Sequence, residues 1–419
     1  MVEAVKGVRD ILPDEIRAWH FVEERARDTF ERYGFREIRT PIFESTELFA
    51  RGIGEGTDIV AKEMYTFPDR KGRSLTLRPE NTAPVARAYI EHQMHRRSEV
   101  ERLYYLGPMF RYERPQKGRM RQFYQIGVEV LGSDHPAIDA ETLEMLVAFL
   151  GRLGIAPVQL VLNSVGDPEC RPAYKEILRR YLLPRRESLC EDCRRRLDTN
   201  PLRCFDCKVP ADRDVMAQAP AILDHLCDAC RGHFERVREH LDAFGIAYTI
   251  DRRLVRGLDY YRRTAFEVTA PGLGAQNALL GGGRYDGLIE ELGGPAVPGF
   301  GFAVGEDRLV MSLPATAAIP DDAPEVFVVG LGEAGVSAAL QAARRLRGSG
   351  HRTLVEPLPG KSLKAQLRRA NDLRARFVLI LGEEEIQRGV MTLKRMSDGS
   401  QATVRLDELD RRLGEMARA

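Results

Sequence analysis

The feature that most restricts the fold of this chain is a pair of long segments, 103–112 and 122–131, in which apolar and polar residues alternate. Alternation with a period of two is typical of β-strands and differs from the spacing of a helix. Only the polar, basic loop 113–121 separates the two segments. They are therefore expected to pair as an antiparallel hairpin, and the core to include an antiparallel sheet.

Helix and strand patterns on both sides of this hairpin extend the same core. A first helix is expected where Phe21, Val22, Ala26 and Phe30 follow helical spacing. The expected helices are 14–33, 83–92, 139–153 and one starting near 306, and the further strands are 35–40, 75–78, 158–163, 247–250, 264–269 and 300–304. The stretch from about 166 to 245 is charged, cysteine-rich and mostly helical in spacing, so it is expected to be an insertion.

The pattern changes after a linker at 314–324, which holds three prolines and several alanines. Strand and helix then alternate, at 326–329, 333–347, 353–355, 362–373 and 377–381. This βαβαβ order predicts a mostly parallel sheet. The expected fold class is thus an α+β core with an antiparallel sheet in residues 1–324, a helical insertion, and a C-terminal α/β domain in 325–419.

Composition and charge narrow the class of protein. The first fifteen residues lack the apolar core of a signal peptide, and no window approaches the roughly 18 apolar residues of a membrane span. A soluble, intracellular protein is expected, and seven cysteines in 419 residues do not form a secreted disulfide framework. Residues 325–419 carry 17 Lys and Arg against 12 Asp and Glu. That surplus indicates either a polyanion partner or a well-solvated surface.

Three short motifs carry candidate chemistry, and each also has an ordinary structural interpretation. The loop 113–121 and its flanks are rich in arginine, which binds phosphate by paired hydrogen bonds, although an exposed hairpin tip would look similar. Residues 256–261, with an arginine, an aspartate and two tyrosines, indicate a small polar pocket or a strand edge. Gly281–Gly283 allow either the close approach of a ligand or a tight turn.

The cysteines form three CxxC pairs, namely Cys190/Cys193, Cys204/Cys207 and Cys227/Cys230. The last two pairs, separated by 19 residues, have zinc-ribbon spacing. Six thiols exceed one tetrahedral site, so one pair would be spare. A structural Zn²⁺ in the insertion and a set of reduced thiols without metal both remain open.

Longer segments resemble one family. Three segments resemble the signatures of class II aminoacyl-tRNA synthetases, namely FREIRTPIFESTELFARGIGE at 35–55, MFRYERPQKGRMRQFYQIGVEVLG at 109–132 and GFGFAVGEDRLV at 299–310. Three more segments resemble the histidine-specific boxes of histidyl-tRNA synthetases, namely TLRPENTAPVARAY at 76–89, LVRGLDYY at 254–261 and GGGRYDG at 281–287. The resemblance to histidyl-tRNA synthetases covers nearly the whole chain.

This resemblance implies an activity and its partners. A member of this family activates L-histidine with ATP and Mg²⁺ to histidyl-adenylate, then transfers it to the 3′ end of tRNA(His), releasing AMP and pyrophosphate. It implies a cytoplasmic homodimer without a membrane partner. The C-terminal domain is similar to the anticodon-binding domain of several class II enzymes.

The resemblance also implies residue roles. The two catalytic arginines on the α-phosphate are Arg111 and Arg256. The ATP site also includes Glu113 and Arg308. The residues around histidine are Glu80, Asn81, Thr82, Gln125, Glu129, Arg256, Tyr260 and Tyr261. The residues at the tRNA acceptor end are Arg114 and Gln116.

Two other functions use a similar core. One is the regulatory subunit of ATP phosphoribosyltransferase, which lacks the C-terminal domain and usually has degraded catalytic boxes. The other is a tRNA sensor without catalysis. The presence of Arg111, Arg256, the GLDYY stretch and the C-terminal βαβαβ pattern argues against both.

Overall fold

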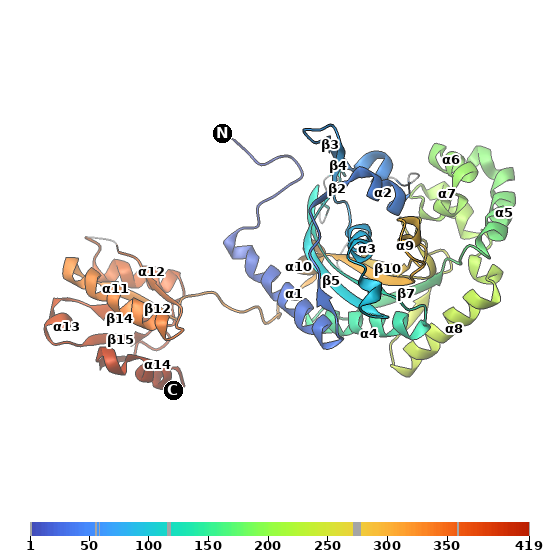
Figure 1. Cartoon of the computed structure of the whole chain (residues 1–419). Helices are drawn as coiled ribbons and strands as arrows, with labels where there is room; N and C mark the ends of the chain where they lie inside the picture. Colours follow the sequence, from blue (N-terminus) through green and yellow to red (C-terminus); the bar gives the residue numbers. More distant parts are fainter. Residues whose placement is uncertain are drawn as a thin grey trace. The chain divides into compact units, whose positions relative to one another are not determined.

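The computed structural model describes residues 2–54, 57, 59–114, 119–270, 278–357 and 360–418 (Figure 1). The chain divides into two compact units, Met1–Ile319 and Pro320–Ala419, and the division falls within the segment expected as a linker. No helix in the described part of the chain is long and apolar enough to cross a lipid bilayer.

The first unit is built on an eight-stranded sheet. Its strands, in spatial order, are β1 (Arg36–Glu37), β5 (Glu101–Phe110), β6 (Gln122–Leu131), β11 (Gly299–Gly305), β10 (Ala278–Arg284), β9 (Arg262–Thr269), β7 (Gln159–Ser164) and β8 (Tyr248–Ile250). The two edge strands run parallel to their neighbours and all other pairs are antiparallel. The predicted hairpin is β5–β6, so the expected antiparallel core is confirmed.

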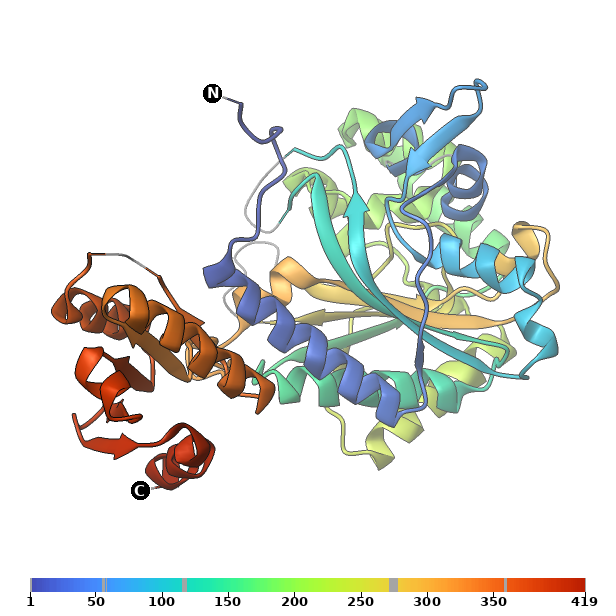
Figure 2. The ribbon, with the colours of Figure 1, turned by 60° about the vertical axis from the view of Figure 1, so that its left-hand side comes forward.

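One face of this sheet is covered by helices α1 (Pro13–Arg32) and α4 (Pro136–Arg152), which lie side by side in Figures 1 and 2. Phe30 of α1 is fully buried, and its ring lies 5.2 Å from that of Phe149 and 6.2 Å from that of Phe302, measured between centroids. The apolar spacing that predicted α1 thus reflects contact with both a helix and the sheet.

The opposite face is bordered by a small sheet, shorter helices and the insertion. The small sheet has β2 (Phe43–Ser45), β4 (Ser74–Leu77) and β3 (Tyr65–Pro68), in that order. The shorter helices on this side are α2 (Thr46–Ile53), η1 (Ile59–Glu63), α3 (Thr82–Glu91), η2 (Met94–Arg96) and α9 (Leu288–Glu291), whereas α10 (Glu306–Ser312) packs against α1. The strand expected at 35–40 is mostly wrong, because only Arg36 and Glu37 pair with β5.

The insertion lies between β7 and β8 and is helical. Its elements are α5 (Arg171–Leu182), η3 (Leu183–Ser188), α6 (Glu191–Thr199), η4 (Pro201–Asp206), α7 (Pro210–Ala217), η5 (Ile222–His225) and α8 (Asp228–Ala243). It has a core of its own around Tyr174, Leu178 and Leu197, whereas Val237 and Leu241 of α8 belong to the main core. The insertion is therefore a small helical body joined to the main core through α8.

The second unit contains a five-stranded sheet in the order β13-β12-β14-β15-β16. Its elements are β12 (Val326–Gly330), α11 (Gly332–Gly348), β13 (Thr353–Val355), α12 (Leu363–Asp372), β14 (Phe377–Leu381), α13 (Glu383–Gln387), β15 (Met391–Arg395), β16 (Gln401–Val404), η6 (Leu406–Glu408) and α14 (Leu409–Arg418). The first three strands are parallel, which confirms the expected α/β domain. The antiparallel pair β15–β16 was not expected.

Candidate active site

A cleft of about 940 Å³ lies over the middle of the large sheet, against β6, β10 and β11. Alternation along β6 explains why this face can hold polar groups. Val128 and Val130 belong to the helix-covered core, so Gln125 and Glu129 lie on the other face of the strand. The walls include the start of α3, Arg111 just after β5, the start of α10, the segment 256–261 and residues 203–208 of the insertion.

The carboxyl group of Glu129 lies directly beneath the floor of this cleft. It is buried and accepts hydrogen bonds from the hydroxyls of two lining residues, Thr82, at 2.7 Å, and Tyr285. Burial raises its pKa to about 8. A buried carboxyl of this kind is stabilised in its charged form by a ligand that donates a hydrogen bond or carries positive charge.

A second buried carboxyl group, that of Glu80, lies near it at the start of α3. It accepts the backbone N–H groups of Thr82, at 2.7 Å, and of Ala83, at 3.0 Å. Burial raises its pKa as well, and the charge of Glu80 contributes to the raised pKa of Glu129. Two acidic groups on one side of the cleft favour a small cationic ligand.

Three tyrosines form the adjoining wall. The ring of Tyr260 lies 4.7 Å from that of Tyr261 and 5.7 Å from that of Tyr285, between centroids. All three are buried and line the cleft, and burial raises the pKa of each phenol. Neutral phenols and acidic groups together suit a ring that has both apolar faces and polar nitrogens.

Two arginines from distant parts of the chain face the same cleft. Nε of Arg111, just after β5, donates to the carbonyl of Pro79 at 2.8 Å, and the guanidinium lies 5.4 Å from the ring of Phe123. Nη1 of Arg256 donates to Glu267 at 3.2 Å. Nε of Arg256 is buried and has no hydrogen-bond partner among the described residues. Each guanidinium group is therefore fixed by one hydrogen bond and has further N–H groups that can donate to an anion.

The glycines of β10 and β11 make room for these side chains. A Cβ atom on Gly281 would lie 2.5 Å from Cζ of Arg256, and one on Gly301 would overlap the carboxylate of Glu129. The Gly281–Gly283 triplet is therefore part of a strand, and the expectation of a tight turn is wrong. A close approach is observed between the backbone of Gly281 and the guanidinium of Arg256, and Gly281 also lines the cleft.

Comparisons with known proteins agree with this geometry. Residues 7–309 match the family described as Histidyl-tRNA synthetase, and residues 325–416 match the one described as Anticodon binding domain. The chain belongs to the histidyl-tRNA synthetase family. Its reaction is the charging of tRNA with histidine, in which L-histidine is first activated with ATP, and its fold is that of a class II aminoacyl-tRNA synthetase.

Individual relatives support the same assignment. The chain is 52% identical to the histidine–tRNA ligase of Syntrophotalea carbinolica, over 100% of this chain and 99% of the relative. It is 53% identical to that of Solibacter usitatus, over 99% of each. The structure of apo histidyl-tRNA synthetase from S. aureus has a TM-score of 0.83 at 38% identity, covering 99% of this chain and 100% of that one.

The alternative function, that of a regulatory subunit, is supported by likeness of fold alone. A structure titled as an ATP phosphoribosyltransferase regulatory subunit/histidyl-tRNA synthetase from Bacillus halodurans has a TM-score of 0.65 at 22% identity, covering 91% of this chain and 98% of that one. The much higher identity to named ligases confirms the expectation of a synthetase.

Most residues expected in the histidyl-tRNA synthetase site do line this cleft, and Glu129 lies just beneath its floor. The lining residues are Glu80, Thr82, Arg111, Glu113, Gln125, Arg256, Tyr260, Tyr261 and Arg308. Glu113 forms an ion pair with Arg119 at 3.1 Å and lies 3.9 Å from Arg111. Arg308 donates to the carbonyl of Ala278. Segments far apart in the chain thus meet at one cleft.

Two expected residues in the described part of the chain are not part of this arrangement. Asn81 accepts hydrogen bonds from Thr40, at 2.6 Å, and from Arg78, at 3.1 Å, so its side-chain oxygen supports the start of α3. Arg114 does not line the cleft. Gln116 lies outside the described residues.

The further lining residues that the sequence did not predict include two that make polar contacts with predicted ones. Tyr285 donates to Glu129, and Glu267 pairs with Arg256. Tyr285 lies in the quoted motif GGGRYDG and could have been found there. Glu267 carries no local signal, because a glutamate on a strand is usually a surface residue.

The two CxxC pairs with zinc-ribbon spacing do not come together in the structure. Cys207 lies in a cluster with Cys190, Cys193 and Asp212, whereas the Cys227/Cys230 pair gathers with Cys170 and Asp167. The spacing of the CxxC pairs did not indicate these clusters, because each includes an aspartate and one includes Cys170, which is in no CxxC motif.

Proposed function

We propose that histidyl-adenylate forms in this cleft, with Arg111 and Arg256 on the α-phosphate of ATP. The observation that carries this proposal is that two arginines far apart in the chain line one cleft. The carboxylate oxygen of histidine forms a bond to the α-phosphorus, and the bond from that phosphorus to the pyrophosphate oxygen breaks. Negative charge builds on the phosphoryl oxygens, and fixed guanidinium groups stabilise it.

The acidic side of the cleft receives the amino acid. Glu80, Thr82 and Gln125 hold the α-ammonium group, while Glu129, Tyr260 and Tyr261 hold the imidazole ring. Imidazole presents two nitrogens, so an amino acid without them would leave a buried carboxyl unpaired. A site of this type discriminates against such an analogue by a factor on the order of 10⁴. Tyr285 orients Glu129 through its hydroxyl.

The opposite side of the cleft receives ATP. Arg308 holds the nucleotide and Glu113 lies at its adenine and pyrophosphate side. The carboxylates of Glu113 and Glu267 line the cleft and are oxygen donors of the kind that Mg²⁺ takes. Mg²⁺ would neutralise phosphate charge there, and zinc in the insertion would take no part in the reaction.

The tRNA is held at two places. Arg114 and Gln116 meet its acceptor end, and residues 325–419 form the domain that binds the anticodon, beyond a catalytic domain of 1–324. The positive surplus of the C-terminal residues supports contact with a polyanion. A cytoplasmic location is part of the proposal, since tRNA charging supplies cytoplasmic translation.

A homodimer is also proposed. In the first signature, Ile42 and Phe43 are 44% and 53% exposed, which is unusual for large apolar residues on neighbouring positions. Burial against a second copy would remove this apolar surface from water. Sedimentation equilibrium should give a dimer for the wild type and a monomer for Phe43→Glu. A monomeric wild type would contradict the proposal.

Amino-acid-dependent ATP–pyrophosphate exchange tests the central proposal. Histidine alone among the amino acids should support exchange, and Arg256→Ala should reduce the rate on the order of 10²-fold or more. The matched control is Arg253→Ala, an exposed arginine in the same segment that does not line the cleft. Equal rates for Arg256→Ala and Arg253→Ala would remove Arg256 from the mechanism.

A further inference from the structure

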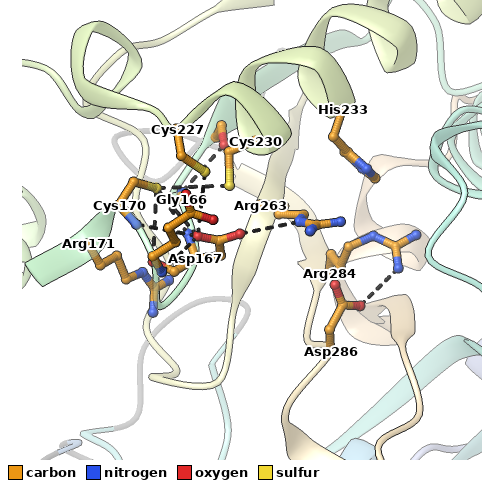
Figure 3. A network of polar contacts seen from close by, with 12 residues as sticks. Gly166, Asp167, Cys170, Arg171, Cys227, Cys230, His233, Arg263, Arg284 and Asp286 are labelled. Carbon is orange, nitrogen blue, oxygen red and sulfur yellow. Dashed lines mark hydrogen bonds and ion pairs between the residues drawn. The ribbon is translucent and has the colours of Figure 1, made fainter.

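The insertion holds two clusters of thiols and carboxylates that the reaction does not use. The first cluster comprises Asp167, Cys170, Cys227 and Cys230 (Figure 3). The second comprises Cys190, Cys193, Cys207 and Asp212. In each cluster, four potential ligand atoms lie within 4.8 Å of one another. Each therefore has the number of donors that a tetrahedral site needs.

The distances fit one tetrahedral ion in each cluster. With Zn–S bonds of about 2.3 Å and a Zn–O bond of about 2.0 Å, sulfur ligands lie ~3.8 Å apart and sulfur and oxygen ~3.5 Å apart. The Sγ atoms of Cys170 and Cys230 are 3.9 Å apart, and Sγ of Cys170 is 3.6 Å from Oδ1 of Asp167. In the second cluster, the corresponding distances are 3.8 Å for Cys190 and Cys207 and 3.4 Å for Cys207 and Asp212.

Disulfide bonds, iron–sulfur clusters and oxygen-seeking cations fit these two sites less well. A disulfide bond needs an S–S distance of about 2.05 Å, and three thiols cannot all be paired. An iron–sulfur cluster would spread its thiolates over several iron atoms rather than gather them around one point. Calcium and magnesium take oxygen ligands, whereas thiolate-rich tetrahedral sites select zinc.

The surroundings orient the ligands in the way that metal sites require. Oδ2 of Asp167 lies 3.6 Å from Nε of Arg263, which leaves Oδ1 toward the thiols (Figure 3). The carboxylate of Asp212 accepts the backbone N–H of Cys190 at 3.1 Å. Cys190 and Cys227 each stand directly before a helix, where backbone N–H groups favour a thiolate.

Each cluster lies next to an arginine that donates to the backbone of the segment 256–261. Arg171 follows Cys170 and donates to the backbone carbonyl of Tyr261. Arg203 lies in η4, the short helix that Cys207 directly follows, and donates to the backbone carbonyl of Arg256 at 3.1 Å. Fixing the two cysteines therefore fixes two contacts to the segment 256–261.

We propose that the insertion binds two zinc ions, one in each cluster, and that they position the segment 256–261 through Arg171 and Arg203. The metal sites stand independently of the residue roles proposed for the reaction, whereas the positioning rests on them.

Zinc measured by mass spectrometry on the full-length, purified chain tests the sites. We expect two zinc ions per chain, one for Cys170→Ser and one for Cys190→Ser. The matched control is Cys204→Ser, a buried cysteine that contacts Cys193 but is not one of the four potential ligands of either cluster, and this variant should keep two. A wild type with fewer than two zinc ions overturns the proposal. If Cys204→Ser loses zinc and Asp212→Asn keeps both ions, the four ligands proposed for the second cluster are wrong.

Two measurements keep the proposal testable if a cysteine variant does not fold. Replacing zinc by Co²⁺ in the wild type should give the thiolate charge-transfer and visible bands of tetrahedral cobalt, and an octahedral spectrum would contradict the sites. For the positioning role, Cys170→Ser should raise the KM for histidine about tenfold, and Glu176→Gln, at an exposed position of α5, should leave it unchanged. An unchanged KM in a Cys170→Ser protein that has lost zinc would refute the positioning.

Discussion

At the residue scale, the site depends on close approach between side chains and glycine backbone. Gly281 leaves space for the guanidinium of Arg256, and Gly301 leaves space for the carboxylate of Glu129. The same face of the sheet therefore brings both charged groups within reach of the cleft. A substrate that joins a phosphate to an imidazole can meet both at once.

Gly281→Ala is expected to displace Arg256 without unfolding the protein, because the guanidinium can move toward the cleft. A misplacement of about 1 Å costs on the order of 10²-fold in rate, so kcat/KM for ATP in the exchange assay should fall by about that factor. Gly232→Ala, on α8 with open space around its Cβ position, is the control. Wild-type activity in Gly281→Ala would show that Arg256 does not need its present position.

Glu129 is expected to make stability depend on pH. Burial raises its pKa from 4.5 to about 8 in the folded protein. A carboxyl with a raised folded pKa contributes stability below its unfolded value, and this contribution is lost as the pH rises toward 8. The free energy of unfolding of the wild type should therefore fall relative to that of Glu129→Gln between about pH 5 and about pH 8. Urea denaturation across this range measures the difference.

The exposed Glu47 provides the control, because its side chain is 73% exposed and its neutralisation should shift stability little. Parallel pH profiles for the wild type and Glu129→Gln would mean that the carboxyl of Glu129 is not desolvated in the folded protein.

At the element scale, apolar spacing predicted the long helices and the β5–β6 hairpin because each has one face on the core. The same reasoning failed for β10, where three glycines carry no apolar pattern and are needed for close packing. It also failed for β15 and β16, which are short and bear few apolar residues. Asn81, expected beside histidine, instead accepts hydrogen bonds from Thr40 and Arg78 at the start of α3. These contacts form only in the folded chain, so the local sequence does not predict them.

The contact between α1, α4 and the sheet predicts a specific loss of stability. Phe30 is fully buried among four aromatic rings, so Phe30→Ala should lower the free energy of unfolding by about 3–5 kcal/mol. Denaturant unfolding followed by circular dichroism measures this. Phe244→Ala, at a half-exposed position, should cost less than about 1 kcal/mol. Equal losses would contradict the assigned core.

At the scale of the whole molecule, the site is assembled from segments that no local pattern connects. Arg111, Glu129, Arg256 and Tyr285 lie far apart in the sequence, and antiparallel pairing of the central strands brings them together. Residue types and their spacing identified each motif separately, and each motif also had an ordinary structural interpretation. The resemblance to a family supplied their convergence, and Tyr285 and Glu267 became evident only with the folded chain.

The division into two compact units predicts separable activities. A chain of residues 1–319 should retain histidine-dependent pyrophosphate exchange within about tenfold, because the cleft lies in the first unit. Charging of tRNA should fall at least about 10²-fold, since the lost unit would supply anticodon contacts and much of the electrostatic affinity. Aminoacylation with tRNA(His) measures this, and full charging by the shortened chain would contradict the role of the second unit.

The central claim is that Arg111 and Arg256 act on one phosphorus, and a double-mutant cycle of histidyl-adenylate formation in single turnover tests it most directly. Groups that stabilise the same charge are not additive. Arg111→Ala and Arg256→Ala should each slow the step on the order of 10²-fold or more, and the double variant should lose much less than the product of the two. Losses that multiply, or a wild-type rate in either single variant, would contradict it.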